Sequence, residues 1–265
     1  MAKNLTLMLE RLLGHTPWAP TMSVRQAKDA YADHRASRGL PRRYAPLLTA
    51  PDANPKLDKS IIPTYGLSLA PADLSGYNVC PWSTPMCRSG CLNTAGYGGF
   101  SDVVQDGRIV KTQFLAENPI AFLVLMEYEI RLAVKRHGRI LMRLNVYSDL
   151  RWERFAPWLF DIEGVDWYDY TKSYARAFES ADWQPNYVLT ASAHERTTPI
   201  QIMALRAAGV SVAKVFTRIP SQGVVNGDLT DDRYHEPKGV LVALKAKGKM
   251  RKNPAAYAGF VTING

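Results

Sequence analysis

The chain has 265 residues, of which 46% are hydrophobic and 22% charged, as is usual for a globular protein with a substantial core. Its formal net charge of +9 favours a polyanionic partner such as nucleic acid, although a solvated basic surface would give the same balance. No apolar run approaches the length of a membrane helix and the N-terminus lacks a secretion signal, so we expect a cytoplasmic protein without a membrane segment.

Residues 1–59 are predicted to form an N-terminal extension. Helix-forming residues occupy 23–39 and stop at Gly39, and the following stretch to residue 60 is rich in proline and irregular. From residue 60 the pattern changes to alternating strands and helices, so residues 60–265 are predicted to be one βα domain.

Six strands are predicted in this domain, at residues 61–70, 139–147, 165–171, 186–193, 210–217 and 239–246. Their nearly continuous apolar character is typical of strands covered on both faces. Helices are predicted from Asn118-Pro119 to Gly138, over 149–162, and from Thr198-Pro199 to Gly209, with Asn118 and Thr198 as caps.

Alternation of strands and helices indicates an α/β fold with a parallel sheet and right-handed crossovers, either an open doubly wound sheet or a barrel. The chain has no G-x-G-x-x-G motif after a strand, which disfavours a dinucleotide-binding sheet. We therefore expect a complete or partial TIM-like βα barrel of about six parallel strands.

Polar side chains follow the carboxyl ends of the predicted strands, where such folds place their sites. Candidate cofactor-binding residues are Asn145, Thr171, Lys172, Lys214 and Arg218. Asp149 and Lys172 are the candidates for acid–base catalysis. The alternative is that these residues are polar only because the strand ends are exposed to solvent.

All three cysteines of the chain, Cys80, Cys87 and Cys91, lie in one Gly/Pro-rich loop, residues 78–99. An odd number cannot pair completely, and clustered cysteines in a cytosolic protein indicate metal or redox chemistry. A structural zinc site needs four ligands, so zinc would require His34 or His137 as well. Three cysteines suit a [4Fe–4S] cluster with one open iron. The remaining alternative is that they are small buried residues.

Five segments in order resemble a family of bacteriophage proteins of the actinobacteriophage type. They are TYGLSLAPADLSGYNVCPWSTPMCRSGCLNTAG (64–96), RILMRLNVYSDL (139–150), WYDYTKSY (167–174), NYVLTAS (186–192) and DDRYHEPKGVLVALKAKG (231–248). The resemblance covers roughly residues 60–250, and its most specific parts are the cysteine loop and the Tyr-Thr-Lys strand end. It implies a phage origin, the host cytoplasm and a fold with a metal-binding loop, and no particular reaction.

A βα barrel with three cysteines after its first strand is also similar, more loosely, to the radical S-adenosylmethionine enzymes. Their usual spacing is C-x3-C-x2-C, whereas the spacing here is C-x6-C-x3-C. This resemblance implies that S-adenosylmethionine would bind the open iron through its amino-acid end, and the departure in spacing puts that cofactor in doubt.

Three hypotheses follow. The first is a phage-encoded protein whose [4Fe–4S] cluster meets a small molecule at the open iron. The second is a nucleic-acid-binding or host-modulating protein with a structural metal, in which the basic patches make the contacts. The third is a zinc hydrolase that activates water. The basic patches are Arg35, Arg38, Arg42 and Arg43; Lys135, Arg136, Arg139 and Arg143; and Lys245, Lys247, Lys249, Arg251 and Lys252.

Overall fold

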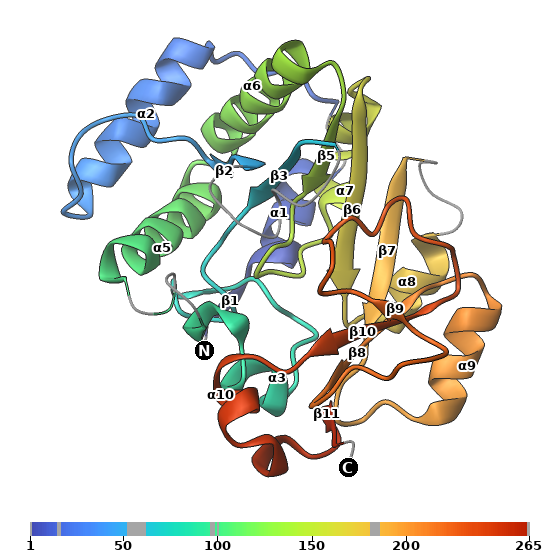
Figure 1. The fold of residues 1–265 in the computed structure, drawn as a ribbon. Helices are drawn as coiled ribbons and strands as arrows, with labels where there is room; N and C mark the ends of the chain where they lie inside the picture. Colours follow the sequence, from blue (N-terminus) through green and yellow to red (C-terminus); the bar gives the residue numbers. More distant parts are fainter. Residues whose placement is uncertain are drawn as a thin grey trace. The chain divides into compact units, whose positions relative to one another are not determined.

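The computed structural model describes residues 2–14, 17–51, 62–95, 99, 101–180 and 186–263 (Figure 1). These residues form two compact units. The first contains the described residues of 1–50, 62–81 and 102–165, and the second contains those of 82–101 and 166–265. The predicted boundary at residue 59 between an N-terminal extension and a barrel domain lies outside the described residues, as do residues 96–98 of the cysteine loop.

The strands of the first unit form two small sheets. In one sheet the order is β2 (Leu48–Thr49), β3 (Thr64–Leu67) and β5 (Ile140–Arg143), with β3 parallel to β5 and antiparallel to β2. In the other, β1 (Lys3–Asn4) pairs in parallel with β4 (Tyr77–Asn78). The strands predicted at 61–70 and 139–147 are therefore present as β3 and β5, each shorter than expected.

Helices of the first unit pack around an aromatic core. The helices are α1 (Leu5–Leu13), α2 (Val24–Ser37), α5 (Asp102–Glu117), α6 (Pro119–His137), α7 (Trp152–Phe155) and the 3₁₀ helix η3 (Pro157–Asp161). Figure 1 shows α2 alongside α5 and α6, and the ring of Phe114 lies 4.6 Å from that of Tyr31 and 6.1 Å from that of Phe122. All three rings are buried, so these helices share one core.

The ends of α6 test the predicted helix signals. Pro119 occupies the first turn and Gly138 ends the helix with a φ of 77°, a left-handed conformation that favours glycine. The Asn118 side chain, however, makes no capping hydrogen bond. The predicted boundaries are confirmed, and the predicted capping by Asn118 is wrong.

The strands of the second unit all pair in parallel. The order is β6 (Val165–Thr171), β7 (Tyr187–Ser192), β8 (Val212–Phe216), β10 (Leu241–Lys245) and β9 (Val225–Asn226), and β11 (Val261–Thr262) pairs with the end of β8. Four of these strands, β6, β7, β8 and β10, match predicted ones. A mixed α/β fold with mostly parallel strands is thus confirmed, whereas neither unit shows a closed barrel among its described residues.

Short helices accompany these strands. They are α3 (Pro85–Ser89), the 3₁₀ helix η2 (Leu92–Thr94), α8 (Tyr174–Glu179), α9 (Pro199–Ala207), α10 (Gly248–Lys252) and the 3₁₀ helix η5 (Pro254–Tyr257). Helix α9 starts as predicted, because Thr198 accepts from the backbone N–H of Gln201 at 3.2 Å and Pro199 fills the first turn.

In the part of the chain that the structure describes, no single helix is long and apolar enough to cross a membrane. Helices α5 and α6 meet the length and composition criteria only when taken together, and they are bent by 116° at their junction.

Candidate functional site

The carboxyl ends of β6 and β7 lie side by side in the second unit and carry polar side chains. Thr171 at the end of β6 pairs with Ala191 of β7, so the residues that follow, Lys172 and Ser192, are neighbours. Nζ of Lys172 donates to Oγ of Ser192 at 2.8 Å, and it lies 5.3 Å from the ring centroid of Phe260. The structure therefore places Lys172 at the carboxyl edge of the sheet, beside a serine hydroxyl.

His194 lies two residues beyond the end of β7, in contact with Tyr174. The two rings stack with centroids 5.6 Å apart, and Tyr174 Oη hydrogen-bonds Thr197 Oγ1. Burial, the nearby charge of Lys172 and that of Arg196 lower the pKa of His194, although Glu195 opposes this shift. His194 is therefore neutral at neutral pH.

Glu195 connects this edge to the helix that carries the second cysteine. Its carboxylate accepts from Thr84 Oγ1 at 2.7 Å and from the backbone N–H of Met86 at 3.3 Å. Although burial opposes the shift, these hydrogen bonds hold the pKa of Glu195 below its usual value. Thr84 also caps α3 by accepting from the N–H of Cys87 at 3.3 Å. The start of α3 is thus fastened to the end of β7.

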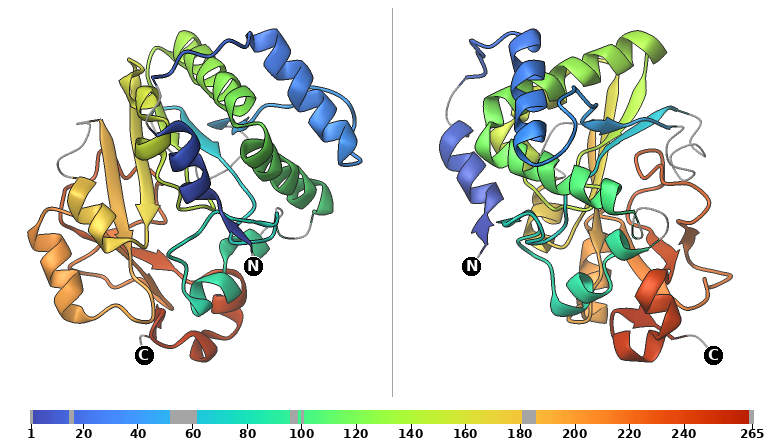
Figure 2. Two further views of the ribbon diagram at one scale, coloured as in Figure 1. Left: turned by 180° about the vertical axis from the view of Figure 1, so that it is seen from behind. Right: turned by 90° about the vertical axis from the view of Figure 1, so that its left-hand side faces the viewer.

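The other side of α3 packs against the C-terminal residues of the second unit. Figures 1 and 2 show α3 beside α10 in every view. A Cβ atom on Gly90 would lie 2.3 Å from Cε of Met250 and 3.0 Å from Cε1 of Tyr257, so a larger residue here would force the Met250 side chain to shift. Cys87 packs against the buried cluster of Met250 and Phe260, the same phenylalanine over which Lys172 lies.

We expect replacement of Glu195 by alanine to loosen α3, because two hydrogen bonds at its start are lost. Hydrogen bonds to a charged group contribute about 1.5–3 kcal/mol, but Glu195 is partly exposed, so we expect only a roughly fivefold rise in the maleimide-labelling rate of Cys87. Mass spectrometry of the labelled peptides measures this rate. Glu179→Ala, which removes an exposed carboxylate at the end of α8, is the matched control and should leave the rate unchanged. An equal rise in both variants would contradict the fastening role of Glu195.

Cys80 belongs to the first unit, where its sulfur is held by backbone groups. Sγ accepts from the N–H of Ala72 at 3.3 Å and donates to the carbonyl of Tyr147 at 3.4 Å. Ala72 has a φ of 52°, and it is the one non-glycine residue among those described with a positive φ. The backbone at Ala72 thus adopts an unusual conformation at the point where its N–H meets the thiol.

Two predicted site residues of the first unit lie in the turn after β5. Asn145 is buried, with Oδ1 accepting from Ser148 Oγ and from the N–H of Leu150, both at 2.8 Å, and Nδ2 donating to the Leu150 carbonyl at 3.0 Å. Asp149 is also buried, and its N–H donates to the carbonyl of Val79 at 2.8 Å. These contacts give Asn145 a role in shaping the turn, and the predicted cofactor contact stays a prediction.

Two further predicted residues, Lys214 and Arg218, lie within β8 and shortly after it. Lys214 is in the middle of the strand, 5.8 Å from the ring centroid of Phe216, and Arg218 is exposed two residues after the strand ends.

Thr171 is the last residue of β6. Its Oγ1 accepts from the N–H of Ser173 at 3.0 Å and helps to turn the chain into α8.

None of the three cysteines forms a disulfide bond with another described residue, and each is partly exposed. Cys80 lies in the first unit and the other two in the second. Within the described residues, no group of three or more His, Cys, Asp or Glu side chains is placed to hold a metal ion. Neither the [4Fe–4S] site nor the alternative zinc site is thereby tested, and both stay predictions.

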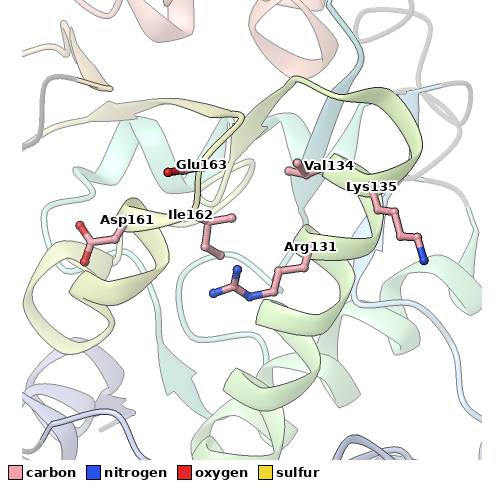
Figure 3. A pocket seen from close by; sticks show the side chains of 6 residues that line it. All are labelled: Arg131, Val134, Lys135, Asp161, Ile162 and Glu163. Carbon is pink, nitrogen blue, oxygen red and sulfur yellow. The ribbon is translucent and has the colours of Figure 1, made fainter.

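A shallow hollow of about 460 Å³ lies on the first unit (Figure 3). Its lining mixes two cationic, two anionic and two apolar side chains, namely Arg131, Lys135, Asp161, Glu163, Val134 and Ile162. Arg131 is paired with Glu127 at 2.9 Å. This balance of charge on an open surface does not point to one class of ligand.

The C-terminal basic patch follows β10 and continues into α10. Lys247 forms an ion pair with Asp228 at 2.9 Å, so part of its charge is neutralised within the protein. Nucleic-acid binding through these residues stays a prediction.

Sequence reasoning did not identify the role of Glu195 or of Phe260. Glu195 directly follows the polar end of β7, so the strand-end rule could have included it, but its contact with Thr84 is tertiary. Nothing in the sequence around Phe260 indicates that its ring lies beside Lys172.

A family profile described as Gene product 88 matches residues 40–261, which is most of the chain. No curated protein and no solved structure matches the sequence. The looser resemblance to radical S-adenosylmethionine enzymes is therefore without support from these comparisons.

Proposed function

The chain belongs to the Gene product 88 family, and on that premise we propose that it is a phage-encoded protein that binds a [4Fe–4S] cluster through Cys80, Cys87 and Cys91. The family match supports a bacteriophage origin. The observation that carries the metal proposal is that every thiol of the chain lies within twelve residues, and that each is partly exposed.

The chemistry of the donors fits an iron–sulfur cluster. Thiolates are the usual ligands of such clusters, and hydrogen bonds from backbone N–H groups to sulfur stabilise the added negative charge. The N–H of Ala72 already donates to Cys80. Lys172 supplies a positive charge over Phe260, the side chain that also belongs to the cluster around Cys87.

Chain length permits the three thiols to share one centre. Ten residues lie between Cys80 and Cys91, and this segment contains Pro81, Pro85 and Gly90, so it can turn back on itself. Three protein ligands leave one iron of a cubane cluster for a small molecule or a fourth ligand, and a closed tetrahedral zinc site would need one more.

The test is the metal content of protein made and purified without oxygen. We expect about four iron atoms and four sulfides per chain, with visible absorption that disappears on oxidation or chelation. Cys80→Ser, Cys87→Ser and Cys91→Ser should each lower the iron content to a small fraction of the wild-type value. Ser83→Ala, within the same segment, is the control and should retain it.

Other results would overturn the proposal. Colourless protein that contains zinc and no iron would favour the zinc alternative. Iron that persists at full occupancy in Cys87→Ser would show that this residue is not a ligand, since the chain has no other thiol to replace it.

A further inference from the structure

Three hydrogen-bonding side chains converge at the ends of two adjacent strands of the second unit. Lys172 follows β6, Ser192 ends β7 and His194 lies two residues further on. The arrowheads of β6 and β7 reach the same edge in Figure 1. All three side chains are half-buried, so a small ligand can reach them while their positions are fixed by the sheet.

Lys172 is positioned as a hydrogen-bond donor. Its Nζ lies over the face of Phe260, whose ring attracts positive charge, and donates to Oγ of Ser192 at 2.8 Å. Because Ser192 Oγ accepts this bond, the serine hydroxyl keeps its own proton for a further acceptor.

His194 presents its Nε2 proton. Nδ1 accepts a hydrogen bond from the N–H of Arg196 at 3.2 Å, which leaves the proton of the neutral ring on Nε2. Within the described residues Nε2 makes no hydrogen bond. The stacked Tyr174 and the bond from His194 N–H to Thr197 Oγ1 at 2.8 Å fix the ring in place.

The acidic residue next to His194 in the sequence hydrogen-bonds to another segment. Glu195 follows His194 directly, and its two carboxylate oxygens accept from Thr84 Oγ1 and from the N–H of Met86. Neither of these two bonds involves the side chains of Lys172, Ser192 or His194.

We propose that this edge is an oxyanion-binding site, in which Lys172, Ser192 and His194 hold a phosphate or carboxylate group of a small ligand. Charge-assisted hydrogen bonds of this kind are the stronger ones in proteins. Phosphate offers three accepting oxygens to the three donors, so we expect it to bind more tightly than acetate. The proposal goes beyond the iron–sulfur function and requires no metal.

The test is a titration of the ¹⁵N-labelled full chain, with its cysteines reduced and metal removed, followed by amide chemical shifts. Sodium phosphate and sodium acetate are the two probes, each against sodium chloride at the same ionic strength. We expect saturable shifts at Lys172, Ser192 and His194 with phosphate, and weaker ones with acetate. If only acetate saturates, the ligand class is a carboxylate and the site stands.

Substitutions distinguish a specific phosphate-binding site from a general effect of positive charge. Lys172→Met should weaken phosphate binding at least tenfold, and Ser192→Ala about threefold to tenfold, as expected for one hydrogen bond. Lys238→Met is the matched control, because it removes the same charge from an exposed position before the amino end of β10. It should bind phosphate as the wild type does.

Two outcomes would overturn the proposal. One is the absence of saturable shifts with both probes. The other is an equal loss of binding in Lys238→Met and Lys172→Met, which would assign the effect to net charge alone. Should Lys172→Met fail to fold, the wild-type titration and Ser192→Ala decide the matter.

Discussion

Replacement of Arg233 by methionine is expected to lower the free energy of unfolding of the second unit by about 3–5 kcal/mol, the usual result of removing one partner of a buried charged pair. The Arg233 side chain is fully buried. Its guanidinium donates to Glu236, to the carbonyl of Thr230 and, at 3.0 Å, to the carbonyl of Gly227. Methionine keeps most of the apolar stem and leaves all three acceptors without this donor.

The network around Arg233 organises the segment between β9 and β10. Nearby, Tyr168 of β6 donates to Asp231 at 3.2 Å, which ties the same segment to β6. Hydrogen exchange followed by mass spectrometry should therefore show the largest loss of protection at residues 225–237, and urea denaturation should give the change in free energy. Arg251→Met, at an exposed position of α10, is the control, with an expected change within about 0.5 kcal/mol.

A double variant identifies the cause of the loss. If the cost comes mainly from the unpaired carboxylate, then Glu236→Met in the Arg233→Met background should recover part of the stability, because the buried charge is removed as well. Strictly additive losses from the two substitutions would contradict this account. They would assign the effect to packing and to the backbone carbonyls.

The longer strands of the second unit could be predicted because their residue types are typical of strands. Strands β6, β7 and β8 are mostly buried and rich in β-branched and aromatic residues, so each run stands out between helix signals. The two-residue strands β1, β2, β4, β9 and β11 contain too few residues to show a period of two. They form through tertiary pairing, which local patterns do not encode.

Helix α5 had no predicted counterpart for a different reason. Its buried face includes Arg108 and Thr112, and these polar residues interrupt the apolar stripe by which an amphipathic helix is recognised. Both have partners in the fold: Arg108 lies 4.4 Å from the ring centroid of Tyr147, and Thr112 accepts from the N–H of Ala70 at 2.9 Å. Polar contacts of this kind become visible only once distant segments are placed together.

The candidate site likewise combines features that the sequence predicts with features that depend on tertiary contacts. The rule that parallel strands carry function at their carboxyl ends directed attention to Lys172, and the register of β6 against β7 brings this residue into contact with Ser192. The same rule also selected Asn145, whose hydrogen bonds go to its own turn. Sequence gives the chemical type of a strand-end residue, and only the local geometry says whether its polar atoms face a ligand or the backbone.

Glu129→Ala is expected to destabilise the first unit by about 3–5 kcal/mol, because two buried backbone N–H groups and the half-buried Tyr44 hydroxyl would lose their common acceptor. The Glu129 carboxylate lies on α6 and accepts from Tyr44 Oη, from the N–H of Leu47 at 2.8 Å and from the N–H of Leu48 at 2.9 Å. It is 8% exposed, so water cannot replace it without a rearrangement. Chemical denaturation measures the loss, and hydrogen exchange should locate it at residues 44–49.

The isosteric variant Glu129→Gln separates the loss of charge from the loss of acceptors. Burial raises the pKa of Glu129, while the bonds from Leu47 and Tyr44 oppose that shift, so burial disfavours the charge at this site. Glutamine retains one oxygen and turns an amide donor toward one backbone N–H, and we expect a cost of about 1–2 kcal/mol, less than that of alanine. Glu163→Ala, on an exposed turn of the same unit, should cost no more than about 0.5 kcal/mol. Equal losses in Glu129→Gln and Glu129→Ala would mean that the charge, and not the set of accepted hydrogen bonds, holds β2 to α6.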